Sequence, residues 1–465
     1  MDVNIKENKM GVAPVGSLLF KMAIPMIISM LVQALYNIVD SIFVSEISED
    51  ALTAVSLAFP LQTLMLAFGL GSSLGVNTLI SRSLGAKDTV SAKKAANCGI
   101  FLAFCNYVFF AIVGLLLSRP FFETQTDSQA IIDMGVSYAT VCLVGSFGLF
   151  QQLAFEKILQ STAKTSLSMI TQLVGAVTNI ILDPVFIFGW LGLPEMGITG
   201  AALATVIGQC SGALCGLIFC IKRNREVPLS IKEIKFDKRI VKEIYRVGLP
   251  SIVMQSIGSV MTFGMNTILM GLTSTASAVF GAYFKLQSFV FMPTFGLNNA
   301  MVPIISYNYG AKRQDRVTRT IKLTVWTAVI IMVAGLLIFE LLPALLLSMF
   351  NASDNMISIG AVALRIIATH FILAGFNIVT GSVFQAIGNP MHSMIVSVCR
   401  QLVVLLPAAF LLSLSGNLSL VWLSFPIAEI VSFALCLFYF VKTLRIANLK
   451  MTDVKACEAK EEFAV

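Results

Sequence analysis

Twelve apolar segments dominate this sequence between Leu18 and Val441, and each is long enough to cross a lipid bilayer. A spanning helix needs about 20 mostly apolar residues, because the hydrocarbon core offers no water to the backbone amides and carbonyls. Of the 465 residues, 57% are hydrophobic and only 12% are charged, which is far from the balance of a soluble globular protein. The sequence therefore predicts an all-α integral membrane protein with twelve transmembrane helices.

The basic residues gather in alternate connections and at both ends of the chain. With the N-terminus placed inside, the inner loops and tails hold all but three of the 32 Lys and Arg, the exceptions being Arg119, Lys285 and Arg365. Because positive residues favour the cytoplasmic side of a membrane, both termini are predicted to be cytoplasmic. The net charge of +7 then reflects this topology and attraction to anionic membrane lipids, and it gives no reason to expect nucleic acid.

The two halves of the chain repeat one another at an offset of 225 residues. The matching pairs are Pro25 with Pro250, Gly85-Ala86-Lys87 with Gly310-Ala311-Lys312, Gln160 with Gln385, and Ser168-Met169-Ile170 with Ser393-Met394-Ile395. Such repetition indicates a duplicated six-helix bundle. We expect an N-terminal lobe at residues 1–221, a cytoplasmic linker with solvated charges at 222–243, a C-terminal lobe at 244–448 and a cytoplasmic tail at 449–465. In parallel-repeat transporters the substrate route lies between the halves.

One acid stands inside an apolar segment, at Asp183. Asn179 lies four residues before it and so projects from the same face of a helix. Pro184 follows at once and leaves the Ile180 carbonyl without its helical partner. An ionisable side chain within the membrane is a functional-site hypothesis by default. The alternative is a carboxylate at the level of the lipid headgroups.

The first apolar segment carries a polar face made of Gln33, Asn37 and Asp40, with Tyr36 beside it. Asp40, Asp183 and Thr205 fall at similar depths. Two carboxylates in one apolar pocket cannot both ionise cheaply, which would make the pair titratable by protons. The same oxygens, with those of Asn179 and Thr205, could instead hold Na⁺. The remaining alternative is a structural hydrogen-bond network.

The repeat supplies a comparison for this acid cluster. At the 225-residue offset, Asp40 corresponds to Met265, Asn179 to Val404 and Asp183 to Ala408. If the fold itself needed these polar groups, both halves should carry them. The cluster is therefore predicted to serve chemistry that was added to one half.

Other charged and polar residues give weaker signals. Glu156 and Lys157 are expected to form a solvated ion pair near the inner face. Glu429 could pair with Arg400 in a structural role, and Lys285 and Arg365 either face a cavity or balance charges in packing. Two histidines, His370 and His392, make no metal cluster. The nine cysteines are scattered without a CxxC pair, so neither disulfides nor metal ligands are expected.

Several stretches resemble the multidrug and toxic compound extrusion (MATE) family, and within it the DinF-like branch with its MepA-type exporters. They are QALYNIVDSIFV at 33–44, SRSLGAKD at 81–88, NIILDPVFIFG at 179–189, GAALAT at 200–205 and VPIISYNYGAK at 302–312. The resemblance runs from about Gly16 to Val441. It implies the MATE fold, in the cytoplasmic membrane of a bacterium, as a monomer that uses no cofactor besides a coupling ion.

The function that this resemblance implies is antiport by alternating access, in which inward H⁺ or Na⁺ drives export of lipophilic organic cations. The ion site would consist of Asp40, Asn179, Asp183 and Thr205, with Thr199 as a rival for the last. Where other branches place a glutamate, this chain has Gln255, which argues against a second ion site. The candidates for contact with substrate are Gln33, Tyr36, Asn37, Glu156, Gln255, Met265 and Met292.

Two related functions on the same fold stay open: a flippase for lipid-linked saccharides and an exporter of one specific metabolite. The first would need a larger cationic cavity, and the central segments supply few Arg or Lys. An enzyme is not expected, because the sequence lacks paired metal ligands, a G-x-S-x-G elbow and an HExxH motif. The absence of a P-loop argues against ATP as the direct energy source.

Overall fold

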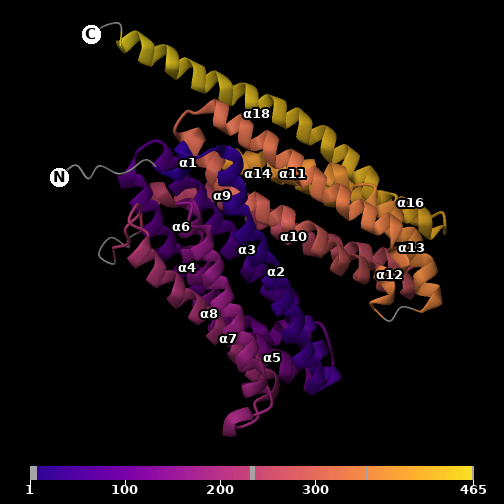
Figure 1. The fold of residues 1–465 in the computed structure, drawn as a ribbon. Coiled ribbons are helices and arrows are strands. Elements are labelled where there is room, and N and C mark those ends of the chain that lie inside the picture. The colour runs from indigo at the N-terminus through magenta and orange to yellow at the C-terminus, as the bar shows by residue number, and fades with distance from the viewer. Residues whose placement is uncertain (1–7, 231–235, 351–352, 463–465) are drawn as a thin grey trace. The chain divides into compact units, whose positions relative to one another are not determined.

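The computed structural model describes residues 8–230, 236–350 and 353–462, and in that part of the chain the regular structure is helical (Figure 1). The first half contains α1 (Lys9–Val12), α2 (Val15–Ile47), α3 (Glu49–Gly85), α4 (Thr89–Glu123), α5 (Gln129–Val144), α6 (Phe147–Ser161), α7 (Thr165–Ile187), the 3₁₀ turn η1 (Trp190–Gly192) and α8 (Gly197–Arg223). The second half contains α9 (Lys238–Met270), α10 (Ser274–Gly310), α11 (Gln314–Leu341), α12 (Pro343–Ser348), α13 (Asp354–Ala368), α14 (Phe371–Ile387), α15 (Pro390–Val398), the π-helical turn η3 (Cys399–Leu405), α16 (Leu406–Ser413), α17 (Leu418–Trp422) and α18 (Ser424–Glu462).

Ten spans in the described residues are long and apolar enough to cross a membrane as single helices. Two further helix pairs pass the same test together but are bent, α5 with α6 by 43° and α13 with α14 by 49°. If each bent pair counts as one span, the total is twelve. The predicted all-α membrane fold is therefore confirmed.

The duplication is visible in the packing of each half. Ser81 Oγ donates a hydrogen bond to the carbonyl oxygen of Ser161 at 3.3 Å, and 225 residues later Ser306 Oγ donates to the carbonyl oxygen of Ala386 at 3.0 Å. The breaks in the two bent pairs also fall at corresponding places, between α5 and α6 and between α13 and α14. Both halves thus repeat one six-span plan.

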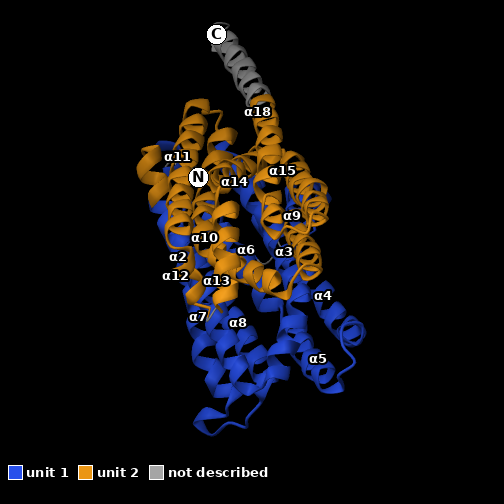
Figure 2. Ribbon diagram, turned by 90° about the vertical axis from the view of Figure 1, so that its right-hand side faces the viewer, with its two compact units in different colours: residues 1–12, 21–252 blue, residues 13–20, 253–465 orange. Residues whose placement is uncertain are grey.

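The chain divides into two compact units whose borders differ from the expected lobes (Figure 2). Unit 1 comprises Met1–Val12 and Lys21–Ile252, and unit 2 comprises Ala13–Phe20 and Val253–Val465. The first part of α9 belongs to unit 1 because glycines let it approach α3 closely. A β-carbon built at Gly75 would lie only 2.2 Å from the carbonyl oxygen of Ile244.

The linker at 222–243 is not simply a solvated connection. Lys164 Nζ donates to Asn224 Oδ1 at 2.7 Å, and Glu226 pairs with both Lys164 and Asn8. Val227 is fully buried. Lys222, Arg223 and Arg225 are exposed, as expected for solvated charges, whereas Glu226 is half-buried because side chains far away in the sequence bind it. Within the expected linker, residues 231–235 lie outside the described part, and α9 already begins at Lys238. At the other end of the chain, α18 runs through most of the expected tail at 449–465.

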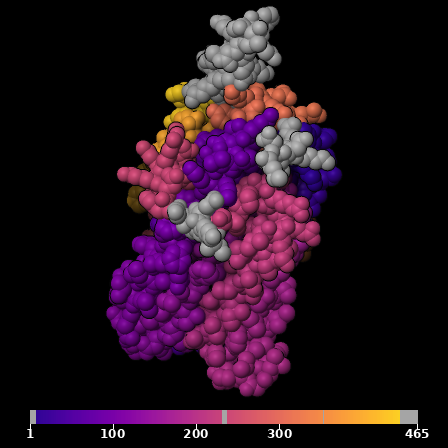
Figure 3. Space-filling model, turned by 90° about the vertical axis from the view of Figure 1, so that its left-hand side faces the viewer, coloured from indigo at the N-terminus to yellow at the C-terminus, as the bar shows by residue number. Residues whose placement is uncertain are grey.

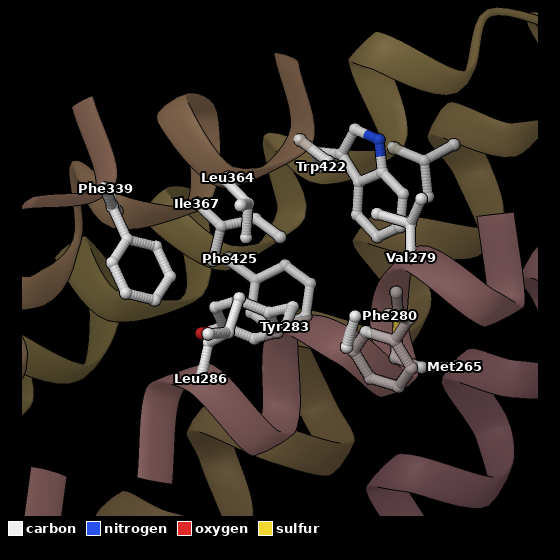
Figure 4. Close-up of a cluster of buried hydrophobic side chains, with 14 of the residues drawn as sticks. Met265, Val279, Phe280, Tyr283, Leu286, Phe339, Leu364, Ile367, Trp422 and Phe425 are labelled. Carbon is white, nitrogen blue, oxygen red and sulfur yellow. The ribbon is translucent and has the colours of Figure 1, made fainter. Parts of the chain in front are cut away.

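Each unit has its own apolar core. In unit 1, Phe110 and Phe150 lie in a buried cluster, whereas α4 exposes Phe104, Ile112 and Leu115 as lipid-facing helices do; Figure 3 shows the outer face of the purple and magenta segments of this unit. In unit 2, Met265 lies in one buried cluster with Phe280, Tyr283 and Phe425, and Figure 4 shows it beside Phe280. Buried aromatic rings therefore occur in the cores of both units.

Candidate functional site

The α7 and α8 helices of unit 1 build the centre of the site. Asp183 and Asn179 are buried on α7, and Asn179 Nδ2 donates to Asp183 Oδ1 at 3.2 Å and to Thr205 Oγ1 of α8 at 3.4 Å. The contact depends on small residues, since a β-carbon built at Gly208 would lie 2.8 Å from the carbonyl oxygen of Gly175. The structure therefore joins Thr205 to this pair, whereas Thr199 has no hydrogen bond to it.

The α2 helix brings the second acid to the same place. Asp40 interacts electrostatically with Asp183, and Tyr36 interacts with both carboxyl groups. Buried polar atoms in proteins nearly always have hydrogen-bond partners. Here three oxygens are buried without one: Asp40 Oδ1, Asn179 Oδ1 and Asp183 Oδ2. The predicted set of Asp40, Asn179, Asp183 and Thr205 thus forms one cluster with unused acceptors.

The oxygen atoms of this cluster can bind only certain ligands. Carboxylate and amide oxygens accept hydrogen bonds and coordinate hard cations, so the cluster can take a proton or a small monovalent cation. Within the described residues, no group of three or more His, Cys, Asp or Glu side chains is arranged to hold a metal ion. The chemistry that the cluster can perform is reversible neutralisation of its acids.

Three further polar residues stand beside Asp40 and were not found from the sequence. Gln62 of α3 donates through Nε2 to the Tyr138 hydroxyl at 3.1 Å and to the Cys142 sulfur at 3.9 Å, both on α5. Tyr138 and Cys142 interact electrostatically with Asp40. The available signal was Gln62, an amide within a predicted membrane-spanning segment.

The substrate candidates of unit 1 lie in different surroundings. Gln33 accepts a hydrogen bond from Gln172 Nε2 at 3.1 Å, Tyr36 is half-buried and Asn37 is exposed. Glu156 is only 6% exposed and accepts from Gln152 at 2.9 Å and Thr171 at 3.3 Å.

Lys157 is likewise 6% exposed and donates to Gln160 Oε1 at 2.9 Å. The expectation of a solvated ion pair between Glu156 and Lys157 is therefore wrong. Both side chains are buried and interact electrostatically with each other, with hydrogen bonds from Gln152 and Thr171 to Glu156 and from Lys157 to Gln160.

The substrate candidates of unit 2 are equally varied. Gln255 is exposed, Met292 is half-buried, and Met265 is fully buried in the aromatic core (Figure 4). Met265 therefore packs the core and offers no surface in this conformation. It occupies the position that corresponds to Asp40 in the repeat.

The charged residues of unit 2 that the sequence singled out each have a partner. Arg400 Nη1 lies 3.1 Å from Glu429 Oε2, so the suggested pair forms. Arg365 Nε lies 4.0 Å from Glu340 Oε2 near the surface. The Lys285 ammonium lies 6.0 Å from the centre of the Phe350 ring, a distance typical of a cation–π contact.

A model of a protein family, described as MatE, matches this chain twice, at residues 25–185 and again at residues 250–411. The chain belongs to the MATE family. The two matches begin 225 residues apart, as the internal repeat does. Members of the MATE family are transporters, so this is a multi-pass membrane protein of a transporter family and no enzyme.

MATE relatives resemble the chain over nearly its whole length. The multidrug export protein MepA of Staphylococcus haemolyticus is 25% identical over 418 residues, which cover 90% of this chain and 91% of MepA. A solved structure of MATE in the straight conformation has a TM-score of 0.89 at 25% identity, covering 95% of this chain and 99% of its own. A structure of MATE in the bent conformation has a TM-score of 0.88 at 25% identity, covering 94% and 97%.

Proposed function

We propose that this MATE protein exports small organic cations, among them drugs and other xenobiotics, in exchange for H⁺ or Na⁺ that enters at Asp40 and Asp183. The observation that carries the proposal is the group of three buried, unpartnered oxygens on Asp40, Asn179 and Asp183. A site that must bind and release an ion in each cycle needs such unused acceptors, whereas a structural network would satisfy them.

The contrast between the two units supports the assignment. At the offset of the repeat, the acid positions of unit 1 correspond to Met265, Val404 and Ala408. Met265 and Val404 belong to the apolar core of unit 2. The fold thus forms a bundle without these acids, and function is the remaining reason to keep ionisable groups inside a membrane.

The mechanism that follows is alternating access with reciprocal linkage. Ion binding at Asp40 and Asp183 neutralises buried charge and favours one conformation, while organic cation favours the other and thereby lowers affinity for the ion. Relatives solved in straight and bent conformations agree with a fold of at least two states. We expect the hinges near Pro25 in α2 and Pro250 in α9, since each lies close to a border between the units.

The membrane setting follows from the charge pattern and the relatives. We infer a place in the cytoplasmic membrane of a bacterium, with both termini inside, because the inner connections carry nearly all Lys and Arg. In that place the protein is in contact with membrane lipids. A monomer is sufficient for transport because one chain supplies both repeats.

The test is gradient-driven transport in reconstituted vesicles. A pH gradient and a Na⁺ gradient are imposed separately while a fluorescent organic cation is followed. We expect one gradient to drive transport, and we expect Asp40→Asn and Asp183→Asn each to abolish it while membrane insertion stays normal. Asp133→Asn is the matched control, because Asp133 lies in an exposed ion pair with Arg119. Retained ion-driven transport in both acid variants would contradict the proposal.

A further inference from the structure

Unit 2 contains a buried polar cluster of its own, formed by Asn377 of α14, Arg400 of η3, and Glu429 and Ser432 of α18. The Glu429 side chain is 3% exposed, and its Oε2 lies 3.1 Å from Arg400 Nη1. Asn377 Nδ2 donates to Glu429 Oε1 at 2.6 Å and to Ser432 Oγ at 3.3 Å. Arg400 lies in a π-helical turn within the span Pro390–Ser413, and such turns are frequent at functional sites.

The fold does not require this cluster. In the repeat, Arg400 corresponds to Gly175 and Asn377 to Gln152. In unit 1, α7 and α8 are in direct backbone contact at this position, since a β-carbon at Gly175 would lie 3.2 Å from the carbonyl oxygen of Gly208. A buried ion pair is often no more stabilising than apolar residues of similar volume. The charges of unit 2 therefore call for a functional explanation.

The geometry of the ion pair leaves it open to exchange. Because Asn377 occupies Glu429 Oε1, the Arg400 guanidinium holds the carboxylate through one nitrogen only. Two-pronged guanidinium–carboxylate pairs are stronger and geometrically more specific. The Arg400 side chain is 30% exposed, ten times the fraction of Glu429. Arg400 is thus the accessible member of the pair, and its outward movement would uncover the carboxylate.

The cluster also holds acceptors that no protein group uses. Asn377 Oδ1 and the Tyr283 hydroxyl are both buried without a hydrogen-bond partner, and Tyr283 interacts electrostatically with Glu429. The amide orientation follows from chemistry, because only its NH₂ group can donate to the carboxylate. An incoming cation with two N–H groups in a fork could donate one to Glu429 Oε2 and the other to Asn377 Oδ1.

We propose that Glu429 and Asn377 form a second binding site, selective for organic cations that carry an amidinium or guanidinium group. The planar head of such a cation takes the place of the Arg400 guanidinium and adds the bond to Asn377. Because the rings of Tyr283 and Phe425 already pack edge to face against each other, with 5.8 Å between their centres, the body of the cation follows the partly exposed path of the Arg400 side chain and does not enter between the rings. The inference rests on the proposed export of organic cations and adds a chemical preference to it.

The experiment compares equilibrium binding of two cations to the purified full-length protein without any ion gradient. p-Aminobenzamidinium has the N–H fork, and tetraphenylphosphonium has no N–H group. We expect Asn377→Leu to weaken amidinium binding about tenfold, as for one charge-assisted hydrogen bond, and to leave phosphonium binding unchanged. Arg400→Gln removes the competing guanidinium and should strengthen amidinium binding about tenfold. Arg365→Gln, in the exposed pair with Glu340, is the matched control and should change neither affinity.

A measurement on the unaltered protein guards against misfolded variants. Agmatine, a guanidinium compound, should displace p-aminobenzamidinium and leave tetraphenylphosphonium bound. Displacement of both cations alike overturns the proposal, as does an unchanged ratio of affinities in Asn377→Leu or weaker amidinium binding in Arg400→Gln. Asp183→Asn separates this site from the ion site, because it should abolish coupled export and keep the ratio of affinities. Retained coupled export in Asp183→Asn and Asp40→Asn would sink the ion-site assignment alone.

Discussion

Asn179 determines how the acids of unit 1 can work. Its amide hydrogens are engaged by Asp183 and Thr205, which turns its oxygen into a free acceptor next to the free Asp183 Oδ2. The same amide fixes the Asp183 carboxyl group in one orientation. Asn179 therefore both positions the acid and completes the set of oxygens around a guest.

Replacing Asn179 by Leu should weaken the coupling ion more than the fold. We expect the ion concentration for half-maximal transport to rise about tenfold, because one acceptor and one positioning hydrogen bond are lost. The measurement is transport in vesicles at a series of ion concentrations. Thr199→Ala is the control, and an unchanged half-maximal concentration in Asn179→Leu would show that the amide is not part of the ion site.

Spacing was sufficient to find Asn179 and Asp183, because residues four apart share a helix face whatever surrounds them. It was not sufficient for Glu156 and Lys157. Whether these two are solvated depends on Gln152 and Gln160 from the same helix and on how closely α7 covers them. Burial of that kind is a property of packing and has no local pattern in the sequence.

At the level of single elements, glycines decide which helices touch. Gly71 and Gly75 on α3 allow the first part of α9 to lie against them, and a β-carbon at Gly71 would be 2.5 Å from Ile252 Cγ1. This contact assigns residues 238–252 to unit 1 although they begin the second repeat. The hydropathy pattern placed the border in the linker, because it marks where spans end and cannot show which neighbour a helix chooses.

Gly75→Leu should therefore disturb unit 1. The side chain would meet backbone, which cannot move aside as a flexible side chain can, so we expect a loss of about 1–3 kcal/mol, the usual cost of overpacking. The check is the thermal unfolding midpoint in detergent. Gly258→Leu on α9 is the control, since a β-carbon there meets nothing within 4 Å. Equal midpoints for the two variants would contradict close packing at Gly75.

The start of α4 offers a prediction about pH. Hydrogen bonds from Ser91 to the capping carboxylate of Asp88 hold the pKa of Asp88 below its ordinary value of 3.8. The folded state therefore favours the charged form, so this stabilisation is present at neutral pH and is lost as the pH falls below 3.8 through the lowered pKa.

Asp88→Ala should lower stability by about 1 kcal/mol at neutral pH, as loss of a helix cap does, and much less once the carboxyl group of the parent protein is protonated. Unfolding midpoints measured across the acid range test this. Asp88→Asn should keep the cap without the dependence on pH. A deficit in Asp88→Ala that stays constant down to the lowest pH would argue against a charged cap.

Over the whole molecule, the duplication accounts for the fold, and the polar residues that differ between the two repeats account for the proposed function. The repeat, the twelve spans and the acids of the first half could be read from the sequence because they rest on hydropathy and identity at a fixed offset. The Arg400–Glu429 contact could not be read with the same ease. This contact depends on the π-helical turn η3, which changes the side of the helix on which Arg400 lies. No residue pattern in the sequence predicts that turn.

The buried apolar core of unit 2 predicts that the ion site cannot be copied there by one substitution. Met265→Asp would bury a carboxylate among Phe280, Tyr283 and Phe425, and we expect a loss of about 3–5 kcal/mol and little protein in the membrane. Met265→Leu keeps the volume and should cost less than about 1.5 kcal/mol. The yield of folded protein in the membrane compares them, and normal amounts of the Asp variant would show that this core tolerates charge.

The most direct test of the central claim measures the coupling ion itself. Purified protein is loaded with the ion that drives transport, organic cation is added without any gradient, and the released H⁺ or Na⁺ is counted. The unaltered protein should release ion as the organic cation saturates it, and Asp40→Asn and Asp183→Asn should release none. Equal release from the unaltered protein and from both variants would place the coupling ion elsewhere and contradict the account.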